Sequence, residues 1–312
     1  MTLNHNGSSI SDPSFIAEAF NSYFSNIASN LDRDIPHSNT SPLYFLRAPV
    51  ENSLFCPSSD SEEIVNLIRR LKNKSTILMN IPVFIYKILA PLIVPKVSML
   101  FNNSLSEGIF PECFKTAKII PIFKSGDSNS TANYRPISML PFLSKMFEKL
   151  MCARLDSYLK SNNILCTNQF GFRKNSNTSD AIIKFLDYVY SSLDKKQSII
   201  AVYLNFSKVF DTVNHEILMS KLQHNCIRGV MLSWFKSYLS NMKKYVSVKN
   251  SSSSLSNITL GVPQGSVLGP VPFLLYINDT HRSSDQMHFV FILLTIQQFL
   301  HPTVSLMVFM PQ

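Results

Sequence analysis

Apolar residues recur with helical spacing through most of the chain from residue 61 onward. Between Ile64 and Leu71 they occupy positions i, i+3, i+4 and i+7, which is the period of one helix face turned toward a core. Ser61, followed by acidic residues in the first turn, gives this stretch the capping-box pattern of a helix start. Similar patterns predict further helices at 91–105, 143–159, 180–195, 214–224, 229–241 and 270–279.

Other stretches have the pattern of β-strands. Residues 117–123 are rich in strand-forming side chains and end at the turn Ser125-Gly126-Asp127. Residues 198–204 form a continuous apolar run, which is typical of a central strand buried on both faces. Residues 244–249 alternate between polar and apolar, and residues 258–260 are expected to return beside them. Helices and strands together predict an α+β protein.

The first 60 residues have a different composition. They are rich in Ser, Asn, Asp and Pro, and only residues 15–31 have helical spacing, so residues 1–60 are predicted to be an N-terminal extension. No run reaches the roughly 20 apolar residues that span a bilayer, and residues 289–294 are too short, so no membrane association is expected. A membrane-associated protein, based on 289–294 and 304–310, is the weakest alternative.

Net charge and cysteine content bear on the binding partner and on the cellular compartment of the protein. The chain has 312 residues and a formal net charge of +9, which fits either a polyanionic partner or an ordinary basic surface. Its five cysteines are scattered and form no CxxC pair, so the sequence indicates neither a zinc site nor a disulfide framework. A reducing, intracellular compartment is the simplest expectation, and nucleus and cytoplasm are equally open.

Five short motifs follow one another between residues 117 and 279. They are 117–127 with 133–138, Gln169-Phe-Gly-Phe-Arg173, residues 204–215, Gly261-Val-Pro-Gln-Gly-Ser-Val-Leu-Gly-Pro270, and residues 273–279. In this order they resemble the reverse transcriptases of non-LTR (LINE-type) retrotransposons, over about residues 61–284. The resemblance implies an RNA-directed DNA polymerase, a nucleotidyltransferase that binds an RNA template, a DNA primer, dNTPs and Mg²⁺.

The same resemblance implies roles for individual residues. The predicted nucleotide-binding residues are Lys118, Lys124, Arg135, Arg173, Phe210, Gln264 and Gly265. The two arginines would contact the triphosphate, with the two lysines nearby. Gln264 would lie beside the incoming nucleotide, and Gly265 would allow a close backbone approach. Phe210 matches the bulky residue that excludes a ribose 2′-hydroxyl, and a core aromatic is the alternative.

Further cations would line a groove for primer and template phosphates. They are Lys115, Lys145, Lys149, Arg154, Lys160 and Lys174. For each of them a solvated helix face is the alternative.

Asn205 stands where the family has its first metal-binding aspartate. An asparagine offers one neutral carbonyl oxygen in place of an anionic carboxylate, so metal binding and rate are both expected to fall. Asp211 is present, but in the family it is not a metal ligand. The family's Phe-Ala-Asp-Asp motif is also missing, because the chain contains no Asp-Asp pair. No catalytic or metal-binding residue is therefore predicted to be intact, and the chain is expected to be an inactive pseudoenzyme.

The tail suggests a shifted reading frame. Read one base later, a synonymous coding of Phe-Ala-Asp-Asp-Thr-Thr-Ile-Phe gives Leu-Leu-Thr-Ile-Gln-Gln-Phe and then Leu or Phe, and residues 293–300 are Leu-Leu-Thr-Ile-Gln-Gln-Phe-Leu. Ordinary substitution is the alternative.

These features predict a truncated, degenerate copy of a right-hand polymerase. It would comprise an extension (1–60), a helical connection and fingers (61–196), a partial palm without its aspartate-bearing strand (197–284), and an out-of-frame tail (285–312), with the thumb absent. An unpaired strand edge would favour instability or aggregation. A non-catalytic RNA-binding remnant of the same domain is the alternative function.

Overall fold

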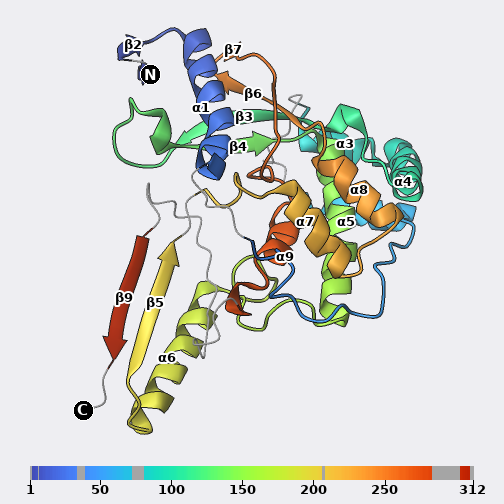
Figure 1. Ribbon diagram of the computed structural model, residues 1–312. Helices are drawn as coiled ribbons and strands as arrows, with labels where there is room; N and C mark the ends of the chain where they lie inside the picture. The colour runs from blue at the N-terminus through green and yellow to red at the C-terminus, as the bar shows by residue number, and fades with distance from the viewer. Residues whose placement is uncertain are drawn as a thin grey trace.

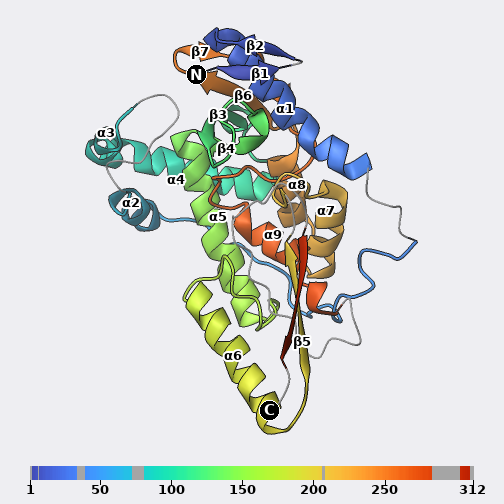
Figure 2. The same ribbon diagram turned by 90° about the vertical axis from the view of Figure 1, so that its left-hand side faces the viewer.

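A computed structural model describes residues 2–5, 7–33, 39–71, 81–205, 208–282 and 303–309 (Figures 1 and 2). The helices are α1 (Pro13–Arg33), α2 (Ser61–Arg69), α3 (Val83–Ile88), α4 (Ala90–Glu107), α5 (Phe142–Ser161), α6 (Thr178–Asp194), α7 (His215–His224), α8 (Val230–Leu239) and α9 (Pro270–Tyr276). The strands are β1 (Leu3–His5), β2 (Ser8–Ile10), β3 (Thr116–Phe123), β4 (Tyr134–Met139), β5 (Ile199–Asn205), β6 (Lys243–Val248), β7 (Ser251–Ser252), β8 (Ser256–Asn257) and β9 (Thr303–Phe309).

The predicted helices are all present, with ends shifted by a few residues. The predicted start of α2 at a Ser61 cap is wrong in one detail. Asp60 is the N-cap, because its backbone is extended and its carboxylate accepts a hydrogen bond from the Glu63 N–H at 2.7 Å. The apolar stripe of this helix is confirmed, since Ile64 and Ile68 are buried.

The helices surround one apolar core, in which α5 is the central element (Figure 1). Phe147, Leu150 and Leu155 of α5 are fully buried. Trp234 of α8 is also fully buried, and its indole N–H donates to Ser104 Oγ of α4 at 2.9 Å. This bond satisfies the polar atom that burial of the indole would otherwise leave unpaired.

A mixed five-stranded sheet lies beside the helices in the described part of the chain. β3 pairs antiparallel with β4 and parallel with β6, while β7 and β8 both pair with β6. The predicted returning strand at 258–260 is wrong. The return is made by β8, and the chain then leaves the sheet after Ile258, whose N–H donates to Met242 O at 2.8 Å.

The first half of the N-terminal extension, which contains α1, packs onto this sheet (Figure 2), whereas Leu54 in its second half belongs to the helical core. Phe20, Phe24 and Ile27 of α1 form a second buried cluster with residues of β3 and β6. Asn21 fixes the position of α1 relative to the sheet, because its side-chain amide donates to Ser254 O at 3.0 Å and to Ser256 Oγ at 2.8 Å. One face of the sheet is therefore covered by α1.

β5 forms a separate two-stranded ribbon with β9, from Ile199↔Phe309 to Asn205↔Thr303 (Figure 1). The predicted central strand is thus wrong, because among the described residues β9 is the partner of β5. β5 thus has a neighbouring strand, but the predicted absence of an aspartate-bearing strand stays a prediction. β9 has no acidic residue, but its backbone supplies donors and acceptors, and its β-branched and apolar residues favour an extended chain.

In the described part of the chain, no helix combines the length and the apolar character needed to cross a bilayer. The residues of the proposed frame shift at 293–300, and the apolar stretch 289–294, lie outside the described residues.

Candidate nucleotide-binding site

The loop 261–270 docks onto the backbone of residues 210–213. Gly261 N–H donates to Val213 O at 2.8 Å, and Val262 N–H donates to Phe210 O at 2.7 Å. Gly261 has φ +84°, and a Cβ atom there would lie 2.6 Å from Phe210 O. Only glycine combines this backbone conformation with so close an approach, so the local sequence dictates the contact between the two motifs.

Gln264 contacts Asp211 across this junction. Its amide donates to Asp211 Oδ2 at 2.7 Å, and its backbone carbonyl accepts from Ser138 N–H of β4 at 2.7 Å. Burial raises the pKa of Asp211, while the Gln264 hydrogen bond and the nearby cations Lys244 and Lys208 oppose that rise. Asp211 was not predicted to hold Gln264, and only the short motif around it signalled importance.

A cavity of about 50 Å³ lies at this junction, between α1, the sheet and residues 257–264. Gln264, Asp211 and Lys244 line it, whereas Lys118, Lys124 and Arg135 do not. Its size admits one or two water molecules and not a nucleotide. In this structure the Gln264 side chain is therefore turned toward Asp211 and not toward the predicted triphosphate contacts.

Lys118 and Arg135 lie on the face of the hairpin opposite α1. Side chains alternate along a strand, and β3 residues Ala117 and Ile119 point into the buried cluster with α1. Arg135 is paired with Ile122, which shares the other face with Lys118. This face is partly open to solvent, since Ile122 is 48 % exposed.

Lys124 directly follows β3 and lies close to Arg135. Burial lowers the pKa of Lys124, and repulsion by the Arg135 guanidinium lowers it further. The structure thus brings three of the predicted cations, Lys118, Lys124 and Arg135, to one hairpin.

Gly265 approaches the same hairpin from the loop. Its φ is +102°, and a Cβ atom there would lie 3.0 Å from Ser138 O. The close backbone approach that this structure shows is to β4, and the predicted approach to a nucleotide stays a prediction. The Gly265 position is next to Ile137, on the partly open face.

Phe210 packs against Phe172, the residue that directly precedes Arg173 in the chain. Phe210 packs against Phe273 at 4.6 Å and edge-on to Phe172 at 5.3 Å between ring centroids. Arg173 Nη1 donates to the carbonyls of Cys166 at 2.8 Å and Gln169 at 3.3 Å. Phe210 is thus a packed aromatic, and Arg173 organises its own loop. The predicted roles toward nucleotide stay predictions.

Comparison with known proteins decides the family. The family model described as "Reverse transcriptase (RNA-dependent DNA polymerase)" matches residues 122–306, more than half of the chain. The chain belongs to the reverse transcriptase family. The resemblance carried by the five motifs is thereby confirmed.

Similar proteins come from mobile elements of Drosophila melanogaster. The chain is 33 % identical over 236 residues to the probable RNA-directed DNA polymerase from transposon BS, covering 75 % of this chain and 26 % of that protein. It is 31 % identical over 240 residues to the RNA-directed DNA polymerase from mobile element jockey, with the same coverage. The X-element polymerase is 33 % identical over 184 residues, which are 59 % of this chain and 20 % of that protein. The chain spans about a quarter of the length of the first two relatives.

Two Mg²⁺ ions, as this family of polymerases uses, need several anionic oxygens on neighbouring strands. Across the described ranges, no group of three or more His, Cys, Asp or Glu side chains could hold a metal ion. Asn205 ends β5 and pairs with Thr303. Asp211 is engaged by Gln264, and cationic side chains lie nearby. The described residues of this reverse transcriptase family member do not fit a two-metal centre.

Two of the predicted groove cations are buried, so their predicted role is wrong. Lys115 is 2 % exposed and pairs with Glu112 at 2.5 Å. Arg154 is 8 % exposed and binds Glu63 at 2.9 and 3.0 Å and Pro57 O at 2.8 Å. Both cations stabilise the helical core and not a phosphate groove.

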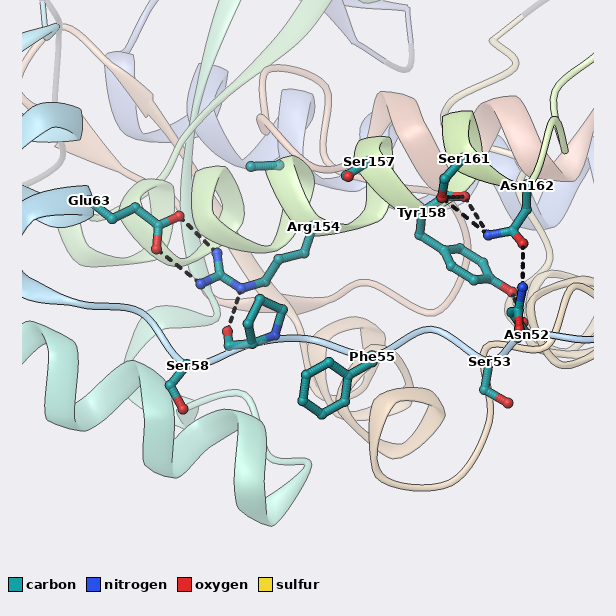
Figure 3. Close-up of a pocket in the computed structure, with 12 residues that line it drawn as sticks. Asn52, Ser53, Phe55, Ser58, Glu63, Arg154, Ser157, Tyr158, Ser161 and Asn162 are labelled. Carbon is teal, nitrogen blue, oxygen red and sulfur yellow. Dashed lines mark hydrogen bonds and ion pairs between the residues drawn. The ribbon is translucent and has the colours of Figure 1, made fainter.

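Arg154 also borders a cavity of about 610 Å³ between α5 and residues 52–58 (Figure 3). Figure 3 shows its guanidinium turned toward Glu63, with Tyr158 and Asn162 at the other end of the pocket. None of the predicted nucleotide-binding residues lines this cavity. It is therefore separate from the loop 261–270 and the other motifs described above.

Glu148 of α5 is a further residue of the site that had no predicted role. It is fully buried, and its carboxylate accepts from Val267 N–H at 2.7 Å and from Tyr238 O–H at 2.8 Å. Burial raises its pKa to about 7, although these hydrogen bonds and Lys145 oppose the rise. The available signal was an acidic residue on the apolar stripe of the predicted helix at 143–159.

Proposed function

We propose that this chain is a reverse transcriptase domain of a non-LTR retrotransposon that has lost RNA-directed DNA polymerase activity. Its ancestor would have copied an RNA template from a DNA primer with dNTPs and Mg²⁺. Asn205 at the end of β5 carries the proposal, because a neutral amide replaces the anionic oxygen that a divalent ion requires. The lack of any Asp-Asp pair in the sequence supports it.

The arrangement expected for such a domain is a set of fingers over residues 61–196 and a partial palm over 197–284. The hairpin β3–β4 with its three cations would belong to the fingers, and β5 with the loop 261–270 to the palm. We further propose that residues 285–312 are out of frame. Sequencing the locus across codons 279–300 tests this, because an intact neighbouring frame must contain two adjacent aspartate codons.

Primer extension tests the proposed loss of activity. The purified chain is incubated with an RNA template, an annealed DNA primer and labelled dNTPs, in Mg²⁺ and separately in Mn²⁺. We expect no incorporation in either metal. The variant Asn205→Asp is also expected to be inactive, because a single restored carboxylate still leaves the site short of anionic ligands.

Non-catalytic RNA binding is a second candidate, favoured by the cations gathered on the β3–β4 hairpin. If Lys118, Lys124 and Arg135 contact phosphates, RNA affinity must fall as salt rises, and the slope must decrease when contacts are removed. The double variant Lys118→Gln/Arg135→Gln tests this. Arg69→Gln/Arg70→Gln at the exposed end of α2 removes the same charge elsewhere and is the matched control. If both double variants weaken RNA binding equally, the binding depends on net charge alone and not on the β3–β4 hairpin.

A further inference from the structure

Hydrogen bonds hold the loop 261–270 at both ends. Those near its C-terminal end belong to a buried network. Glu148 Oε2 accepts from Val267 N–H at 2.7 Å, and the Leu268 backbone also donates to this carboxylate. Glu148 Oε1 accepts from the Tyr238 hydroxyl at 2.8 Å, and the Ser266 side chain lies near that hydroxyl. Three consecutive loop residues, 266–268, therefore connect to one carboxylate–phenol pair.

The surroundings of this pair are rigid. Tyr238 is 1 % exposed, its ring stacks on Trp234 at 5.8 Å, and it meets Phe110 edge-on at 5.1 Å. Within the loop, Ser266 Oγ accepts from Gly269 N–H at 3.0 Å, and a Cβ atom at Gly269 would lie 2.4 Å from that oxygen. A packed anchor and a tight turn fix where residues 266–269 run.

We propose that Glu148, together with Tyr238, is a positioning residue for the nucleotide-binding loop. It holds residues 266–268 against α5 and α8, so that Gln264 and Gly265 lie against Asp211 and β4. The inference rests on the proposed function in so far as the loop contacts nucleotide. Glu148 acts through the loop and touches no reacting atom.

An apolar side chain could not replace Glu148. A leucine would fill much of the same volume, but the buried Val267 N–H would lose its acceptor and the Tyr238 hydroxyl its partner, and such unpaired groups are costly. An acid in this position serves the loop in both protonation states. The ionised carboxylate accepts from both donors, whereas the neutral acid accepts from Val267 N–H with its carbonyl and donates its proton to the Tyr238 oxygen.

Glutamine reproduces the neutral acid. Its carbonyl can accept from Val267 N–H and its amide can donate to Tyr238 Oη. Because burial favours the neutral form of Glu148, opening the loop to water must favour the ionised form. Loop opening should therefore become easier as pH rises, and it should not depend on pH in Glu148→Gln.

The other ionisable groups near Glu148 are few. Lys145 and Cys152 lie on the same helix and Tyr238 lies on α8, while loop residues 266–268 carry no titratable side chain. Burial raises the pKa of Cys152 to about 11 and that of Tyr238 well above its ordinary value. Lys145→Met tests the remaining neighbour and should leave the form of the pH dependence unchanged.

Hydrogen–deuterium exchange of the peptide spanning 262–270 measures loop opening directly. Rates are corrected for the intrinsic pH dependence of amide exchange. With a pKa of about 7 in the closed loop and an ordinary carboxyl pKa in the open loop, linkage predicts about tenfold more opening at pH 8 than at pH 6. Glu148→Gln should be protected at both values, and Glu148→Ala should be at least tenfold less protected at both.

Two phenols on the same core provide the matched control. Tyr238→Phe removes the partner of Glu148, whereas Tyr158→Phe removes a hydroxyl that lies 2.7 Å from Asn52 O and Asn225 O at the far end of α5. Only the first should loosen the loop. Unchanged loop exchange in Glu148→Ala and Tyr238→Phe, or a pH dependence that persists in Glu148→Gln, would overturn the proposal.

Nucleotide binding is measured separately, by titrating the chain with a fluorescent dNTP. Wild-type binding that weakens at least tenfold in Glu148→Ala and is rescued in Glu148→Gln supports both the positioning role and the proposed function. Exchange data as predicted, with no dNTP binding by the wild-type chain, support the positioning role and count against nucleotide recognition. If Glu148→Ala fails to fold, the wild-type and Glu148→Gln pH profiles still decide the matter.

Discussion

Replacing Gly261 with alanine should destabilise the protein far more than an ordinary loop substitution. Two separate effects contribute. A left-handed backbone costs a non-glycine residue roughly 1–2 kcal/mol. In addition, the new Cβ would lie 2.6 Å from Phe210 O and 2.7 Å from Asp211 O, which real contacts do not reach, so the loop must move.

That movement would break the hydrogen bonds from Gly261 N–H to Val213 O and from Val262 N–H to Phe210 O. Each is worth about 1 kcal/mol net. Together with the backbone term, the expected loss of unfolding free energy is about 3–4 kcal/mol.

Gly7→Ala is the matched control. Gly7 also has a positive φ, +79°, but an added Cβ would meet nothing within 4 Å. It should therefore cost only the backbone term of roughly 1–2 kcal/mol. Urea unfolding of both variants, followed by circular dichroism, gives the two free energies. If Gly261→Ala were no more destabilised than Gly7→Ala, the loop would not be seated on residues 210–213 as described.

Three further predictions concern the core. The pKa of Glu148 rises from 4.5 to about 7 on folding. Its contribution to the free energy of unfolding is therefore fully present below pH 4.5, and about 3 kcal/mol of it is lost as pH rises through 7. Urea titrations at several pH values should show this fall in the wild type and not in Glu148→Gln. Arg154→Met should cost about 2–3 kcal/mol, since Glu63 is only partly exposed and loses its partner; the double variant with Glu63→Gln should recover part of the loss, and additive losses would argue against the ion pair. Ser104→Ala should cost about 1–3 kcal/mol by leaving the Trp234 N–H unpaired in the core, and an unchanged thermal midpoint would contradict that bond.

Local patterns in the sequence were enough to predict every described helix except the short α3 (Val83–Ile88). A period of 3.6 residues depends only on which face meets the core, and α2 and α5 follow it closely. A polar cap marks the start of α2, whereas the N-cap of α5 is Pro141. The motif order was enough to predict the family, because five short motifs resemble those of its members and follow in the same order, and the family model matches residues 122–306.

Contacts between distant segments were not predictable from such patterns. The docking of α1 on the sheet depends on Phe20 and Phe24 meeting β3 and β6, and nothing local indicates that partner. The partner of β5 was missed for a related reason. Backbone pairing needs only an extended segment of suitable length, so β9 can occupy the position even though its side chains differ from those expected.

Some residues of the candidate site were also predictable from the sequence, and others were not. Gly261 and Gly265 were informative because close backbone approach selects glycine wherever it occurs. The cations were not, because Lys115 and Arg154 look like surface residues in sequence, and their burial and their pairing with Glu112 and Glu63 are seen only in the folded chain. Glu148 was visible as a polar residue on an apolar stripe, but its partners come from two other elements.

Primer extension by the purified, folded chain tests the proposed loss of polymerase activity most directly. The whole jockey RNA-directed DNA polymerase is assayed alongside as the positive control, and a cooperative urea transition shows that the chain is folded. If Asn205 stands at the position of a metal-binding aspartate, as proposed, no incorporation of labelled dNTP above the enzyme-free background is expected in Mg²⁺ or Mn²⁺. Template-dependent incorporation that grows with the concentration of the chain would contradict the proposed loss of polymerase activity.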